Sequence, residues 1–363
     1  MCKKYFKHFW LIIFSFFILM PKSAYADVGT PLMLLGAGHL LIGNAIIGIF
    51  EGLIVAKLFG ARTVKSILIM VLANYISMVA GVVGIWSLGG ALNNVASINN
   101  VFAIILAMLA GSYIATIFIE WPFCFWILKG KEDRHNRAFK ASAVINSASY
   151  AILIPIYFLV SGTSLMTNVK VDKSLSFLKT RNAWVYFISS EDRALYKIRV
   201  NGTAKQKVKE ARLTNKYEVL FACSKDGKAN LGAYWAENGR WSKPIILLGN
   251  LLGATAVSED CGESDRWHND EVIDFRSPNV RDWSVNTGSW AIVGLNGENK
   301  KTGKSLHIAL ETPFLMWPIS KATVLPEDQV ICQVGNQIVL FDLNTRRIGL
   351  ITFGNSPVVI LEE

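Results

Sequence analysis

Residues 51–81, EGLIVAKLFGARTVKSILIMVLANYISMVAG, decide how the N-terminal half of this chain folds. Two apolar runs stand on either side of a short basic turn, and they carry two polar residues, Glu51 and Asn74. Apolar runs of this length cross a bilayer as helices. The stretch therefore predicts a helical hairpin in a membrane, with an acid and an amide inside it.

A second stretch, residues 120–152, EWPFCFWILKGKEDRHNRAFKASAVINSASYAI, has the same arrangement with Glu120 and Asn146. Glu51 precedes the turn glycine of its hairpin by nine residues and Glu120 by ten. Both carboxyls should therefore lie roughly 14 Å from the helix ends, and each asparagine returns to a similar depth. Neighbouring polar residues share the same helix faces. The predicted intramembrane polar site consists of Glu51, Asn74, Glu120, Asn146, Asn44, Ser77 and Ser149.

This polar site has two interpretations. A glutamate deep in lipid costs roughly 2.5–3.5 kcal/mol, so both acids should face the interior of the bundle. No Lys or Arg lies at that depth, so a neutral acid hydrogen-bonded to asparagine is the less costly state. The site either holds helices together, at about 0.6 kcal/mol per hydrogen bond, or forms a path for protons or cations, which intramembrane acids mark.

Four apolar stretches, near 31–59, 66–88, 101–128 and 140–163, are each long enough to span a membrane. The first and third connections are basic, whereas the middle one, SLGGALNNVASINN, carries no charge. Because basic loops stay in the cytoplasm, both hairpins should run outside–inside–outside as parallel repeats. Whether a homo-oligomer completes this small bundle is left open.

The N-terminus, MCKKYFKHFWLIIFSFFILMPKSAYADVG, begins with lysines, continues with about twelve apolar residues and ends in a small-x-small site. This layout predicts a signal peptide over residues 1–26. The alternative is an uncleaved anchor, although the apolar run is short for a span. Cleavage after Ala26 would leave Asp27 outside the cytoplasm.

Composition divides the 363-residue chain into a transmembrane domain at 27–166 and a domain at 167–363. The first 166 residues carry a net charge of +7, and the remainder only +3. The basic excess therefore reports membrane topology, and a nucleic-acid footprint is missing. We expect a bacterial inner-membrane protein whose C-terminal domain lies on the periplasmic side.

From about residue 169 the pattern changes to short runs of period two, which predict an all-β domain. Comparable units begin near residues 182, 230, 289 and 328, a spacing of about 40–60 residues that is typical of propeller blades. The domain has room for only about four blades, at the low end for closure. A propeller-like fold is expected, with a β-sandwich as the alternative.

The first of these units resembles blades of the TolB-like propeller families. The matching features are an aromatic strand, an acidic turn, an LYxI strand and an xG turn, here Tyr186-Phe187, Glu191-Asp192, Leu195-Tyr196-Lys197-Ile198 and Asn201-Gly202. The resemblance covers about 25 residues well and the other units loosely. It implies a rigid surface for binding a partner rather than catalysis.

Cysteines and acids of the β-domain give only weak site candidates. An oxidising compartment permits one disulfide among Cys223, Cys261 and Cys332, and the sequence does not select the pair. A weak calcium candidate is formed by Glu259, Asp260, Glu263 and Asp265, whose spacing fits no EF-hand. No cofactor motif or catalytic motif accompanies them.

Together these patterns favour a non-enzymatic protein that is anchored in the lipid bilayer and binds an envelope protein or glycan through its exported domain. The competing hypothesis is a small ion- or proton-coupled channel or transporter that uses Glu51 and Glu120. An enzyme on the outer side ranks third.

Overall fold

A computed structural model describes most of the chain, with gaps. The described residues are 29–160, 164–180, 182–209, 218–225, 228–237, 240–251, 272–275, 282–287, 294–312 and 314–362. The predicted signal peptide and the calcium candidates lie outside them. The chain forms two compact units, Met1–Gly43 and Asn44–Glu363. The first unit contains the start of one long helix.

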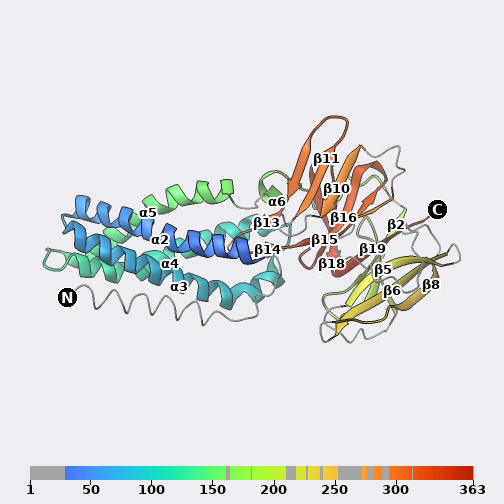
Figure 1. The fold of residues 1–363 in the computed structure, drawn as a ribbon, viewed down its shortest axis with the longest axis horizontal. Coiled ribbons are helices and arrows are strands. Elements are labelled where there is room, and N and C mark those ends of the chain that lie inside the picture. The colour runs from blue at the N-terminus through green and yellow to red at the C-terminus, as the bar shows by residue number, and fades with distance from the viewer. Residues whose placement is uncertain are drawn as a thin grey trace. The chain divides into compact units, whose positions relative to one another are not determined.

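Helices make up the N-terminal part of the described chain (Figure 1). They are α2 (Gly29–Phe59), α3 (Thr63–Val95), α4 (Val101–Ile127), α5 (Arg134–Val160) and the short α6 (Ser164–Thr167). Positive-φ glycines, Gly60 and Gly130, lie in the two turns that separate α2 from α3 and α4 from α5. The two predicted hairpins are therefore present as helix pairs.

Three of the described helices are long and apolar enough to cross a membrane, over Leu41–Phe59, Thr63–Leu92 and Val101–Ile127. Their apolar side chains mostly face outward: Trp86 is 70% exposed and Leu68 64%. Large apolar side chains left open over whole helices indicate a lipid-facing surface. The fourth predicted span, near 140–163, falls on α5 and runs past the described residues, so only three spans are seen within the part of the chain that the structure describes.

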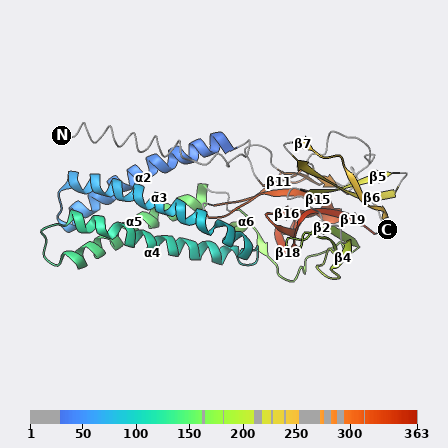
Figure 2. The ribbon, with the colours of Figure 1, turned by 90° about the horizontal axis from the view of Figure 1, so that it is seen from below.

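Inside the helical part, residues of α2, α3, α4 and α5 form a small buried core near the basic turns. Val55, Met70, Cys124 and Ala141 are all fully buried there. Figures 1 and 2 both show α3, α4 and α5 running side by side. This core lies close in sequence to the predicted polar residues, so it positions them.

The C-terminal part consists of strands, as predicted. They are β1 (Lys170–Val171), β2 (Ala183–Ile188), β3 (Leu195–Arg199), β4 (Gln206–Lys209), β5 (Glu218–Lys225), β6 (Lys228–Glu237), β7 (Arg240–Trp241), β8 (Ile245–Leu251), β9 (Ile273–Asp274), β10 (Trp283–Thr287), β11 (Leu295–Asn299), β12 (Ser305–Ile308), β13 (Leu310–Glu311), β14 (Met316–Trp317), β15 (Ile319–Leu325), β16 (Gln329–Val334), β17 (Gln337–Asp342), β18 (Arg347–Phe353) and β19 (Asn355–Leu361), with a 3₁₀ turn η2 (Pro326–Asp328).

These strands form several sheets rather than one. The largest has the order β1-β18-β17-β16-β15-β9, and the others are β19-β2-β3-β4, β5-β6-β7 with β8 on β6, β10-β11-β12 and β13-β14. The last strand, β19, pairs with β2, and the first strand, β1, pairs with β18, so strands from the beginning and the end of the domain are neighbours in two sheets. Within the described residues these sheets close into neither a barrel nor a propeller. The predicted β-rich domain is confirmed, and its propeller-like form is not seen.

The quoted TolB-like unit folds as a hairpin. β2 and β3 pair antiparallel from Trp184 with Arg199 to Ile188 with Leu195. Asp192 accepts hydrogen bonds in the turn from the Ala194 amide and from the Tyr196 hydroxyl. The acidic turn residue is thus explained by local structure.

The connection between α3 and α4 is built into the core of the β-domain. Ala96, Ile98 and Val101 are buried in one cluster with Leu310 and Trp317, among others. The Ile98 amide donates a hydrogen bond of 2.8 Å to Oε1 of Gln337, a side chain with no exposed surface. We call these contacts the joint. Through it, the helical part and the β-domain share one hydrophobic core.

Candidate functional sites

Close packing of α2 against α3 sets the position of the first acid. A Cβ atom at Gly48 would lie 2.5 Å from the Cα of Val71, and one at Gly52 would lie 2.5 Å from the Cα of Ile67. Any larger residue at either glycine would therefore overlap the backbone of α3. Glycines that face a neighbouring helix permit this approach in membranes. Glu51, between the two, is carried into the interior of the bundle.

Glu51 and Asn74 form the first half of the site. Asn74 Nδ2 donates 2.6 Å to Glu51 Oε2, and it also donates 3.0 Å to the Met70 carbonyl one turn earlier. Glu51 is 1% exposed and Asn74 5%. The predicted contact between acid and amide within a hairpin is therefore present in the structure, and the second amide hydrogen fixes the asparagine side chain to its own helix.

The second hairpin has the same contacts. Asn146 Nδ2 donates 2.9 Å to Glu120 Oε2 and 3.0 Å to the Ser142 carbonyl, again one turn earlier. Glu120 has no exposed surface. Ser142 in turn donates 2.8 Å to the Ile117 carbonyl of α4, which joins the two helices of this hairpin.

The remaining oxygen of each carboxyl accepts a hydrogen bond from the opposite hairpin. Ser149 Oγ of α5 donates 2.6 Å to Glu51 Oε1, and Ser77 Oγ of α3 donates 3.2 Å to Glu120 Oε1. Each acid thus accepts one bond from its own hairpin and one from the other. We call this set of six residues, Glu51, Asn74, Ser77, Glu120, Asn146 and Ser149, the polar centre.

Asn44, the seventh residue of the predicted polar site, contacts α3, the other helix of its own hairpin. Its Nδ2 donates 3.2 Å to the Met78 sulfur. At the corresponding place of the second hairpin, the rings of Tyr113 and Tyr150 meet edge to face, with centroids 5.2 Å apart. Polar and aromatic pairs thus link the helices of each hairpin on the side of the polar centre away from the basic turns.

The chemistry of the polar centre follows from its partners. Amide and hydroxyl groups supply the hydrogen bonds described here, and none comes from a lysine or arginine. Such a site satisfies buried oxygens and holds four helices in register. It also places two carboxyls, each able to carry a proton, in one hydrogen-bonded set.

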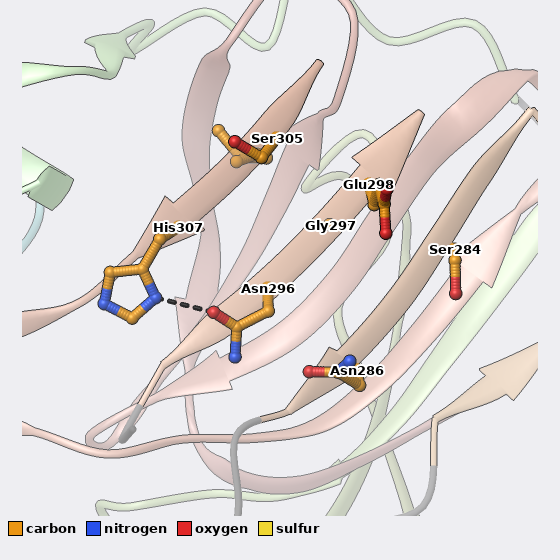
Figure 3. Close-up of a pocket in the computed structure, with 8 residues that line it drawn as sticks. Ser284, Asn286, Asn296, Gly297, Glu298, Ser305 and His307 are labelled. Atoms are coloured by element: carbon orange, nitrogen blue, oxygen red, sulfur yellow. Dashed lines mark hydrogen bonds between the residues drawn. The ribbon is translucent and has the colours of Figure 1, made fainter. Parts of the chain in front are cut away.

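A second candidate site is a shallow pocket of about 320 Å³ on the sheet β10-β11-β12. Figure 3 shows its polar side chains standing on one face of the three strands. His307 Nδ1 and Asn296 Oδ1 lie 2.7 Å apart across β11 and β12. The lining residues are Ser284, Asn286, Asn296, Gly297, Glu298, Ser305, Leu306 and His307. Hydroxyl, amide, carboxyl and imidazole groups suit a small polar ligand.

Sequence patterns did not identify this pocket. Its polar side chains alternate with buried residues such as Leu306 and Ile308, so each strand by itself has only the pattern of a half-buried strand. The pairing of three strands, which no local signal specifies, brings the polar residues together. No described group of three metal-ligating side chains occurs in this or any other part of the chain that the structure covers.

The structure distinguishes a bonded cysteine from a free one in the β-domain. Cys223 is disulfide-bonded, whereas Cys332 is a free buried thiol whose pKa is raised to about 12 by burial. Of the three candidates for one disulfide, Cys332 is therefore excluded. Cys261 is the other candidate of the three; like Glu259, Asp260, Glu263 and Asp265, it lies outside the described residues.

Comparison with known proteins adds no relative. No protein-family model matches the chain, and no curated protein matches it.

Proposed function

We propose that this chain is a non-enzymatic membrane protein that holds a β-domain outside the cytoplasm, where the domain binds an envelope protein or glycan. The joint carries this proposal. Because the α3–α4 connection is part of the β-domain core, the domain is fixed to the helices and does not hang on a linker. A fixed orientation suits a binding surface that must face one way.

The proposed topology has four crossings, including α5. Arg134 Nε donates to the Phe125 carbonyl, Ser142 to that of Ile117, and the hydroxyls of Ser147 and Tyr113 lie 2.7 Å apart. α5 thus runs antiparallel along most of α4. If α4 crosses the bilayer, α5 returns across it, with its polar face against the bundle.

The proposed orientation follows from charge. The turns after α2 and α4 carry the basic residues, and the joint lies at the opposite helix ends. Basic turns remain in the cytoplasm. The β-domain is then extracytoplasmic, which agrees with a disulfide at Cys223. The inner membrane of a bacterium is the proposed location.

The proposed binding surface includes the β10-β11-β12 pocket, and the TolB-like unit supports the same role by its resemblance. A photo-crosslinking residue placed at Ser305 in the full chain tests this in cells, with Lys173 as an exposed control outside the pocket. We expect a discrete adduct from Ser305 alone, which His307→Ala abolishes. Identical adducts from both positions would remove the pocket from the proposal.

A second function, ion or proton transport, is favoured by one observation. Two buried carboxyls belong to one hydrogen-bonded set inside the helical bundle. Acids within a membrane often mark the path of a transported proton or cation. Proton and cation flux into liposomes, measured for the purified chain and for Glu51→Gln/Glu120→Gln, decides the matter. Flux that disappears with the glutamates supports transport. Background flux from folded protein leaves the polar centre as a structural clamp.

A further inference from the structure

The turns that connect α2 to α3 and α4 to α5 are rich in positive charge. Residues 57–65 and 129–140 contain eight lysines and arginines but only two acids. We call the eight the basic tips: Lys57, Arg62, Lys65, Lys129, Lys131, Arg134, Arg137 and Lys140.

Contacts between the hairpins bring the two turns together. Lys65 Nζ of α3 donates 3.0 Å to the Trp126 carbonyl and 3.4 Å to the Ile127 carbonyl, at the end of α4. Lys131 Nζ lies 3.6 Å from the position that a Cβ would occupy at Gly60. The basic residues therefore form one patch rather than two separate turns.

The chain balances only part of this charge, because the two acids of these stretches, Glu132 and Asp133, stand against eight bases. None of the ion pairs among the described residues involves a member of the basic tips. Lys57, Arg62, Lys129, Lys131 and Lys140 are exposed. The first turns of α3 and α5 contain no acids, although acids are favoured at helix starts and bases are not. Local stability alone would select a different composition.

We propose that the basic tips bind the headgroups of anionic phospholipids. The patch lies at the ends of helices that are apolar enough to cross a membrane, which is the level of lipid phosphates. Each base near an anionic surface contributes about fivefold in affinity. Bound lipid phosphates supply negative charge beside the first turns of α3 and α5, which contain no acids of their own. This inference does not depend on what the β-domain binds.

The test counts lipids retained by the purified full chain in native mass spectrometry, from micelles containing phosphatidylglycerol or phosphatidylcholine. Purified protein removes any effect of orientation in the cell. We expect phosphatidylglycerol to be retained in preference, and Lys129→Gln/Lys131→Gln/Lys140→Gln to lose about fivefold per charge. The preference should also weaken as salt rises.

A matched control removes three exposed lysines of the β-domain, Lys173→Gln/Lys300→Gln/Lys304→Gln, and should keep the preference. Equal retention of both lipids by the unaltered chain would overturn the inference without involving any variant. Displacement of the lipid by glycerol phosphate in solution would also overturn it, because the patch would then be a site for soluble phosphate.

Discussion

Ser149 in the second hairpin donates a 2.6 Å hydrogen bond to Glu51 in the first. Ser77 in the first hairpin likewise donates a 3.2 Å hydrogen bond to Glu120 in the second. The two hairpins are therefore tied by exchanged serines, each three residues after the asparagine that serves its own acid. Exchange of this kind makes each carboxyl a contact among three helices.

Removal of an exchanged serine should loosen the bundle. Ser149→Ala leaves one oxygen of Glu51 without a donor, and we expect a loss of about 0.6–2 kcal/mol in resistance to denaturation in detergent. Ser147→Ala is the matched control, because Ser147 is exposed two residues away and bonds to Tyr113. Equal losses from both variants would argue against a special role of the exchange.

Glycine packing gives a sharper stability test. Gly52→Ala would place a methyl group 2.5 Å from the Cα of Ile67, so the helices must separate, and we expect a loss of about 1–3 kcal/mol. Gly81→Ala on α3 meets nothing within 4 Å and should be neutral or stabilising by up to about 1 kcal/mol. Thermal unfolding in detergent compares the two, and a harmless Gly52→Ala would contradict the described helix contact.

The joint predicts that the β-domain depends on the helices. Gln337→Leu leaves the buried Ile98 amide without its acceptor, and this should destabilise the chain by about 1–3 kcal/mol. Gln206→Leu, at an exposed strand position, serves as control. Limited proteolysis at increasing temperature measures the difference. A truncated chain that begins at residue 164 should aggregate, since it uncovers Leu310 and Trp317; a stable, soluble fragment would be evidence against the joint.

Cysteine chemistry provides a test of the disulfide. Peptide mapping without reduction should find Cys223 in a disulfide, with Cys261 as its predicted partner, and Cys332 as a thiol. Cys332 should resist alkylation at pH 8 until the protein is denatured, because burial both blocks the reagent and raises its pKa to about 12. Rapid labelling of folded protein at Cys332 would contradict its position in the core.

Acid should weaken the β-domain through Asp342. Burial alone would raise the pKa of this carboxyl, but hydrogen bonds from Thr345 and Lys179 outweigh it and lower the pKa below its ordinary value. A lowered folded-state pKa stabilises above the unfolded value and loses that effect as pH falls through the folded one. The melting temperature of the unaltered chain should therefore drop more between pH 7 and pH 3 than that of Asp342→Asn. Parallel curves would show that Asp342 does not contribute to the acid response.

Hydrophobic period, charge and helix rise are local properties, so the sequence predicted the helix pairs, their basic turns, the matching positions of Glu51 and Glu120 along their helices and the change to strands. Three of the four predicted spans are confirmed as long apolar helices, and the fourth, near 140–163, extends past the described part of α5. Only the tertiary structure decided that Ser149 bonds to Glu51, that Gln337 holds the α3–α4 connection and that His307 stands beside Asn296. Those relationships join residues distant in the chain, and packing, which no short window of sequence encodes, selects them.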